Sequence, residues 1–391
     1  LGADSYMDTQ NRQSATVGSI SAMTSMRGKV DNEQEISANF VLSSKALLRN
    51  AGEQVQLMHD TLHSVRFDET ARIRELVSQQ RARREQAITG NGHGLAMAAA
   101  CAGMSPLAHL NHRLSGLEGI RGIRALDEDL RQAEGLESFA AGMVELHQQV
   151  VAMPLQLLTI AEDEQVDTLA SQALELWGGL SGSAREQGFA LPAIRERRGE
   201  MWLTNTQVNF CARAYPTVPV GHPDAAALTV LGGFLRNGFL HRAIREQGGA
   251  YGGGASQDSG IAAFRFYSYR DPRLGETLAD FDASISWMLE ASHDYRALEE
   301  AILGVIGSLD KPSSPAGEAK HHFHNRLFGR THAQREEFRQ RVLGVTLEDL
   351  HRVAESYLKH ELASTAVVTN AARLEETAGL RSELSLVVEE L

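Results

Sequence analysis

The sequence lacks the features that define several large classes of protein. Only two of its 391 residues are cysteine, Cys101 and Cys211, which is too few for a disulfide framework or a four-cysteine zinc site. No segment approaches the roughly 18 consecutive apolar residues of a membrane-spanning helix. The net charge is −12, whereas nucleic acids and anionic membranes attract basic surfaces. We therefore expect neither nucleic acid nor a membrane as a partner.

Motifs that indicate common catalytic and nucleotide-binding sites are missing too. GLSGS at 179–183 does not match the G-x-S-x-G of serine hydrolases, and no P-loop sequence occurs. The glycine run at 248–254 follows a predicted helix, which reverses the strand–loop–helix order of a dinucleotide site. No secretion signal follows the first residue, Leu1. We expect a fragment or processed product, whose compartment stays unknown with the cytoplasm as the best guess.

What is present indicates an ordinary globular chain, with 42% hydrophobic and 23% charged residues. A length of 391 residues predicts two or three domains. Strand-like alternation at 14–30 and 35–42 precedes helical spacing of apolar residues at 45–65. The apolar run LQLLTIA at 155–161 predicts a further strand, and a helix follows it.

A similar order of elements begins again after the polar, glycine-rich segment 181–200, which we interpret as a linker. Strands are predicted at 201–214 and within 248–270, around a helix at 224–246. More helices and a last strand follow. We therefore predict an α+β protein with two similar domains, 1–180 and 201–391. Each is expected to be an antiparallel-rich mixed sheet packed with helices.

The fifteen histidines raise the question of a metal site. His59 and His63 have the i, i+4 spacing of zinc peptidase helices, but no glutamate lies between them. The other histidine groups have no nearby cysteine or clear carboxylate partner: His109 with His112, and His321, His322 and His324 near His332. We expect ordinary packing, capping or surface roles for all of them, and no metal in this chain. His93 lies between glycines, where a packing role is favoured.

The basic run at 81–84 is flanked by Glu75 and Glu85. A solvated helix face explains it better than a nucleic-acid patch.

The segment 240–272 carries the most informative combination of residues. Arg245 ends an amphipathic helix, glycines follow as a stop signal, and Tyr251 begins the next strand. A guanidinium and a phenol hydroxyl are both hydrogen-bond donors that suit a peptide carbonyl or an oxyanion. From the residues alone, a helix-capping arginine and an edge-strand tyrosine remain the alternative.

This segment resembles the insulinase-like (pitrilysin) zinc metallopeptidases, and within them the presequence-protease-like branch. The resemblance rests on IREQGGAYGGG at 244–254 and on FRFYSYRDPRLGETL at 264–278. VGSISAMTS at 17–25 and NGHG at 91–94 add to it, and it extends over roughly 14–370. It implies the LuxS/insulinase-like metallohydrolase fold.

The zinc motif of that family, His-x-x-Glu-His, is absent from the sequence. The resemblance therefore implies the C-terminal, non-zinc half of a metalloendopeptidase that degrades unstructured peptides, with zinc held by an N-terminal partner half. This chain alone is expected to be inactive. By motif matching, Arg245 and Tyr251 would contact the substrate carbonyl or oxyanion. The neighbouring substrate-binding positions would be Gly249, Ala250, Gly252, Gly253 and Ser268.

Two alternatives stay open at this point. The chain could be a free-standing inactive homologue that acts as a peptide-binding or assembly subunit. It could instead be a scaffold without a ligand, in which Arg245 and Tyr251 are buried and paired internally.

Overall fold

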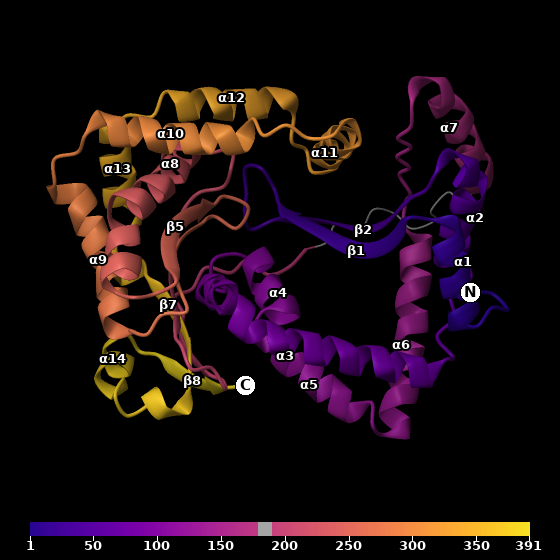
Figure 1. Ribbon diagram of the computed structural model, residues 1–391, viewed down its shortest axis with the longest axis horizontal. Coiled ribbons are helices and arrows are strands. Elements are labelled where there is room, and N and C mark those ends of the chain that lie inside the picture. Colours follow the sequence, from indigo (N-terminus) through magenta and orange to yellow (C-terminus); the bar gives the residue numbers. More distant parts are fainter. Residues whose placement is uncertain (179–189) are drawn as a thin grey trace.

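The computed structural model describes residues 1–178 and 190–391. The first part contains one hairpin and a series of helices (Figure 1). Its elements are α1 (Tyr6–Thr16), β1 (Ser19–Gly28), β2 (Ile36–Lys45), η1 (Leu48–Asn50), α2 (Ala51–His63), α3 (Thr70–Cys101), α4 (Pro106–Ser115), α5 (Leu117–Asp129), α6 (Ala133–Ala152) and α7 (Asp163–Trp177).

The second part contains a six-stranded sheet with helices around it. Its strands are β3 (Gly199–Leu203), β4 (Phe210–Pro216), β5 (Gly252–Asp258), β6 (Ala263–Tyr269), β7 (Ser364–Thr369) and β8 (Val387–Glu390). Its helices are α8 (Ala225–Leu235), η2 (Arg236–Gln247), α9 (Gly275–Glu290), α10 (Tyr295–Leu309), α11 (Pro315–Leu327), α12 (His332–Leu343), α13 (Leu347–Tyr357), η3 (His360–Leu362), η4 (Ala371–Arg373) and α14 (Ala378–Glu383).

The six strands lie in the order β5-β6-β4-β7-β3-β8. The pairs β5–β6, β6–β4 and β4–β7 are antiparallel, whereas β7–β3 and β3–β8 are parallel. The sheet is therefore mixed and rich in antiparallel pairs, as expected. Because β5 is the first strand in this order, none of the strands that the structure describes pairs with its outer edge.

Helices cover both faces of the sheet, and they come from both parts of the chain. One face packs against α8, α9 and α13 through a core that includes Phe264, Phe266 and Phe281. The other face packs against α3 and α4 from the first part through a core that includes Phe210, Ala96 and Ala99. The predicted domains 1–180 and 201–391 therefore share a hydrophobic core, and their division remains a prediction.

Helix α3 reaches the sheet because of a local break in its geometry. Asn91 has non-helical dihedral angles (φ −130°, ψ 25°). The next residue, Gly92, lies so close to the ring of Phe210 that a Cβ atom there would be 2.4 Å from two ring carbons. Only glycine allows this approach. The helix thereby brings His93, the following residue, against the sheet.

The structure confirms the α+β class and corrects several expected elements. Residues 155–161 form no strand, so the sheet of the first part has only the two strands β1 and β2, paired antiparallel. The strand expected at 201–214 is two strands, β3 and β4, separated by a turn. Part of the linker expected at 181–200 lies outside the described residues, and 190–198 has no regular secondary structure.

Candidate functional site

Arg245 lies in the last turn of η2, a stretch with π-helical hydrogen bonding that continues α8. Gly249 adopts a left-handed conformation (φ +76°) and ends the helix. Its N–H donates to the carbonyl oxygen of Arg245 (3.1 Å), and the N–H of Ala250 donates to that of Ile244 (3.1 Å). The Arg245 side chain is exposed and makes no hydrogen bond or ion pair with any described residue. π-Helical turns are rare and often occur at functional sites.

Tyr251 follows this helix end directly and precedes the edge strand β5. Its backbone N–H donates to the carbonyl oxygen of Tyr269 (3.0 Å), which ties it to β6. Its side chain is 68% exposed, and its ring packs edge-on against Tyr269 with the centroids 5.4 Å apart. Both predicted donors are therefore at the surface, which argues against the scaffold alternative with buried, paired side chains.

Arg273 fixes the end of η2 in place, a role that the sequence did not reveal. Its Nη2 atom donates to the carbonyl oxygen of Ala243 (3.2 Å) and to Asp280 (2.8 Å). The guanidinium passes over Gly248, where a Cβ atom would be only 1.9 Å from Nη2. Gly248 is thus needed for close approach, beyond its use as a stop signal.

Asp271, in the same SYRDPR segment, joins this loop to the sheet. Its carboxylate accepts hydrogen bonds from the Arg273 N–H (3.0 Å) and from the Thr277 hydroxyl (2.7 Å). Its backbone exchanges two hydrogen bonds with Asn209, at 2.8 and 2.9 Å. Burial raises the pKa of Asp271. The segment that carried much of the family resemblance therefore builds the frame around Arg245 and Tyr251.

The five other predicted substrate-binding residues have different surroundings. Gly252 and Gly253 are half-buried on the edge strand, and a Cβ atom on Gly252 would have no neighbour within 4 Å. Gly249 is exposed. Ala250 is 4% exposed, with its methyl group in the core. Ser268 was wrongly assigned, because it is fully buried and its hydroxyl accepts a hydrogen bond from the Cys211 N–H (3.2 Å).

The histidine groups do not assemble a metal site. Within 1–178 and 190–391 no group of three or more His, Cys, Asp or Glu side chains could hold a metal ion. The residues of these two ranges therefore do not form a site that fits zinc. The rings of His59 and His63 pack against each other in a tilted arrangement (4.6 Å between centroids), and each meets Trp177 edge-on. His112 is fully buried beside Trp202, and burial with the nearby Arg198 lowers its pKa to about 4.

The basic run at 81–84 and the two cysteines also have structural surroundings. Arg81 pairs with Glu85 (3.2 Å) and with the buried Asp127 of α5 (2.9 Å), so only part of the run is the solvated face that we expected, and Arg81 instead joins α3 to α5. Cys101 and Cys211 are buried and unpaired. Burial raises the pKa of Cys101 to about 12, so this thiol is a poor nucleophile.

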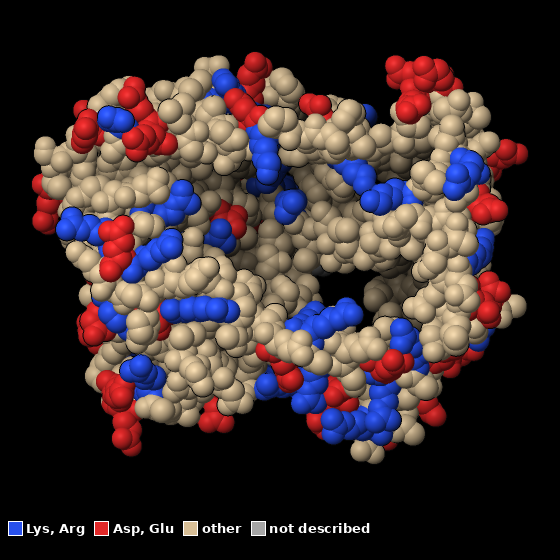
Figure 2. Space-filling view, in the orientation of Figure 1, with Lys and Arg blue, Asp and Glu red and all other residues tan. Residues whose placement is uncertain are grey.

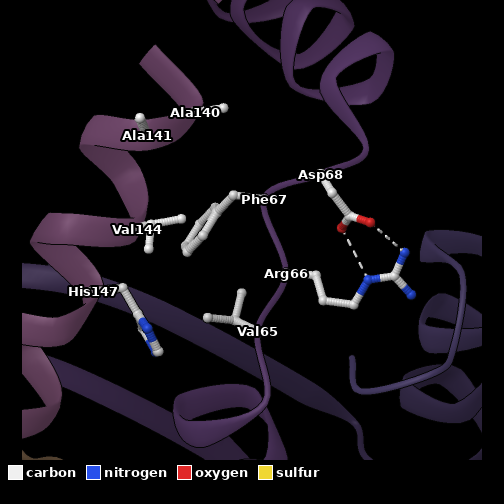
Figure 3. A pocket seen from close by; sticks show the side chains of 8 residues that line it. All are labelled: Val65, Arg66, Phe67, Asp68, Ala140, Ala141, Val144 and His147. Atoms are coloured by element: carbon white, nitrogen blue, oxygen red, sulfur yellow. Dashed lines mark hydrogen bonds and ion pairs between the residues drawn. The ribbon is translucent and has the colours of Figure 1, made fainter. Parts of the chain in front are cut away.

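A shallow groove of about 400 Å³ lies elsewhere, between α6 and residues 65–68 (Figure 3). Its lining is mostly apolar, with Phe67 and Val144 facing each other and an ion pair between Arg66 and Asp68 (2.9 Å) at its side. The Nε2 atom of His147 is hydrogen-bonded to the carbonyl oxygen of Leu62 (2.5 Å). The groove shows no arrangement for catalysis. Figure 2 shows a larger hollow in this face of the molecule, with Lys and Arg side chains on its rim.

Family models match both parts of the chain. A model for the region associated with peptidases of family M16, subfamily C, matches residues 1–126, and one described as "PreP C-terminal domain" matches residues 199–372. Among solved structures, a peptidase M16 inactive domain from Pseudomonas fluorescens superposes with a TM-score of 0.60 at 14% identity, covering 94% of this chain and 84% of that one. A protease from Helicobacter pylori gives 0.59 at 12% identity, covering 94% and 85%. The fold is that of the insulinase-like peptidases.

Curated relatives narrow the assignment. The mitochondrial presequence protease of Danio rerio is 28% identical over 378 residues, covering 90% of this chain and 36% of that protein. That of Kluyveromyces lactis is 32% identical over 304 residues, covering 76% and 30%. The chain thus spans about a third of the length of these relatives. It belongs to the insulinase-like family and corresponds to the C-terminal half of the presequence-protease branch.

The comparisons bear on location only through the relatives' names. These are mitochondrial, or in one case chloroplastic and mitochondrial, and give no support to the cytoplasmic expectation. No helix among the described residues is both long and apolar enough to cross a membrane.

Proposed function

We propose that the chain forms the non-zinc wall of a metalloendopeptidase chamber for unstructured peptides, closed by a zinc-binding partner half. Three findings support this proposal. The chain matches the model of the presequence-protease C-terminal domain, it has the fold of an inactive domain of an M16 peptidase, and the part of it that the structure describes contains no group of three or more side chains that could hold a metal. In this arrangement the partner half supplies zinc and the attacking water.

Arg245 and Tyr251 then act on the substrate carbonyl. Their donors are exposed, free of partners among the described residues, and held by a rigid helix end and a strand start. Negative charge develops on the carbonyl oxygen as water adds, and preorganised donors stabilise that charge. The observation that carries the assignment is the Tyr251 side chain, which is 68% exposed although its backbone is hydrogen-bonded to β6.

The free edge of β5 provides a way to hold the peptide. An extended segment adds to an exposed sheet edge through main-chain hydrogen bonds. Gly252 leaves space for a close approach, since nothing lies within 4 Å of its Cβ position. The strand begins one residue after Tyr251, so a peptide added there would pass the phenol. We expect weak binding by this half alone, because closure of both halves supplies most of the buried surface.

The test is turnover of an unstructured peptide by the protein that contains both halves. Removing one oxyanion donor typically lowers the rate by about 10²–10³. Tyr251→Phe removes only the hydroxyl and should lower kcat/KM to this extent without changing the unfolding midpoint. Arg245→Lys keeps the charge but loses the planar fork, and should fall short of full activity. Tyr295→Phe is the matched control, because Tyr295 is 63% exposed and lies at the start of α10.

Near wild-type kcat/KM in both folded variants would refute the assignment. Loss of activity together with loss of folding would instead favour capping and packing roles. The alternative of an inactive peptide-binding or assembly subunit predicts a tight, specific complex with a folded protein. Metal analysis after gel filtration provides a further check, since chelator-resistant, stoichiometric zinc in this chain alone would contradict the proposal.

A further inference from the structure

Few contacts hold the Tyr251 side chain, although its proposed role requires the hydroxyl to reach a single carbonyl oxygen of the substrate. Its backbone is fixed by the hydrogen bond to Tyr269, but its ring is largely in solvent. Among the described aromatic residues, only Tyr269 lies in ring contact with it, edge-on at 5.4 Å and 87°. The direction of the phenol therefore depends on the position of the Tyr269 ring.

The Tyr269 ring is surrounded on its other sides. The imidazole of His93 packs against it with the centroids 4.7 Å apart, and Phe210 lies 6.0 Å away. The guanidinium carbon of Arg270 lies 5.4 Å from the ring centroid, within the range of a cation–π contact. His93 also lies 5.7 Å from Tyr267, the residue that shares this face of β6. The Tyr269 ring is thus contacted by His93 from α3, by Phe210 from β4 and by Arg270, which follows β6.

His93 belongs to the first part of the chain, and the break in α3 places it against the sheet. Asn91 interrupts the helix, and Gly92 lets it settle on Phe210. The Nδ1 atom of His93 is buried without a hydrogen-bond partner among the described residues. Burial lowers the pKa of His93, so the ring is neutral near pH 7. The contacts of His93 described here are therefore made by its ring and not by its Nδ1 atom.

We propose that His93 and Tyr269 are positioning residues for Tyr251, joined in a chain of ring contacts that begins on α3 and ends at the candidate site. This inference rests on the proposed function for its effect on catalysis, but not for its effect on the Tyr251 ring. The first part of the chain thereby contributes a side chain to a site built by the second. Small errors in placement are costly in catalysis.

The first experiment measures the Tyr251 ring directly. 3-Fluorotyrosine is placed at 251 in the protein containing both halves, and its fluorine resonance is recorded without substrate. Tyr269→Leu and His93→Ala should each narrow and shift this resonance, because the ring gains freedom. Tyr269→Phe and His93→Phe keep a ring and should leave it nearly unchanged. An unchanged resonance in both ring-removing variants, with unfolding midpoints near wild type, would overturn the proposal.

The second experiment uses turnover and a double variant. Tyr269→Leu should lower kcat by about tenfold, with KM nearly unchanged, since the misplaced hydroxyl matters mainly in the transition state. Because Tyr269 acts through the Tyr251 hydroxyl, adding Tyr269→Leu to Tyr251→Phe should cause no further loss. Additive losses would overturn the positioning role. If Tyr251→Phe alone has no effect, the proposed function fails, while the fluorine signal still decides whether the ring chain exists.

Discussion

In the second part of the chain β7 is buried at all six of its positions, whereas in the first part the 20-residue helix α6 has no buried residue at all. The same contrast separates two regions of the molecule. The sheet body comprises the six-stranded sheet, its helices and α3 to α5. The outer arm comprises residues 6–63 and 133–177: in Figure 1 its helices α1, α2, α6 and α7 lie on the right, and the β1–β2 hairpin reaches from them toward the sheet. Few of the arm's large apolar side chains are buried, notably Ile36, Leu57 and Trp177.

The two regions differ in how many of their apolar side chains are buried by other residues of the same chain. The sheet body has two continuous cores, one on each face of the sheet. The arm instead exposes apolar residues along α6 and the segment after it, among them Leu146, Met153 and Leu157. Contiguous exposed apolar surface usually marks an interface. We interpret the arm as a surface for the partner half, and the sheet body as the rigid support of the candidate site.

The largest expected effect sharpens this comparison with one substitution in each region. Phe210→Ala in the sheet body should lower the free energy of unfolding by about 3–5 kcal/mol, because Phe210 is fully buried against α3. Phe40→Ala on β2 should cost less than about 1 kcal/mol, since Phe40 is 48% exposed. Urea unfolding of both variants measures the difference. Equal costs would show that the arm has a core of its own.

The sequence predicted the sheet body better than the arm, for a physical reason. The alternating residues of β6 identify a strand correctly, because β6 pairs with a neighbour on each side, β5 and β4. LQLLTIA at 155–161 is an apolar run, but no strand among the described residues pairs with it, and a strand does not form alone.

The sequence predicted the hydrogen-bond donors of the candidate site, but not the residues that pack around them. Arg245 and Tyr251 are close in sequence, so their motif was visible. Ser268 was misplaced because alternate residues of β6 face opposite sides, and it turns into the core while its neighbours Tyr267 and Tyr269 face α3. The contact of His93 with Tyr269 joins residues far apart in the chain, and no local pattern reveals it.

A second prediction concerns acid stability of the sheet body. His112 lies fully buried beside Trp202, and its pKa is lowered to about 4, chiefly by burial. The unfolded chain binds a proton near pH 6.5, so it holds more protons than the folded chain between these values. The free energy of unfolding should therefore fall by up to about 3 kcal/mol as the pH drops from 6.5 to 4.

His112→Gln, which does not titrate, should flatten that part of the profile. Urea unfolding at several pH values between 4 and 7 compares the two proteins. His351→Gln is a suitable control, since His351 is exposed on α13. A profile that stays as steep in His112→Gln as in the wild type would remove His112 as the cause.

A third prediction tests the link between the sheet body and the site. Gly248→Ala places a Cβ atom where the Arg273 guanidinium lies, and overpacking of this kind costs about 1–3 kcal/mol. It should also release the end of η2 and so lower kcat/KM of the enzyme with both halves. Gly252→Ala has open space around it and should leave the unfolding midpoint nearly unchanged. If both alanine variants lose the same stability, the cost of Gly248→Ala does not come from the contact with Arg273, and the prediction is wrong.

The smallest expected change in stability comes from a substitution in the arm. The same substitution also tests whether the arm contributes to association with the partner half. Leu157 is 39% exposed in an irregular segment, so Leu157→Ser should change the unfolding free energy of this chain by no more than about 0.5 kcal/mol. If the arm meets the partner half, the same change should weaken association of separately prepared halves, measured by analytical ultracentrifugation. Leu303→Ser is the matched control, because Leu303 is 66% exposed on α10 in the sheet body and should affect neither quantity. A clear loss of stability with Leu157→Ser would mean that the arm is packed internally. Unchanged association would mean that its apolar surface does not face the partner half.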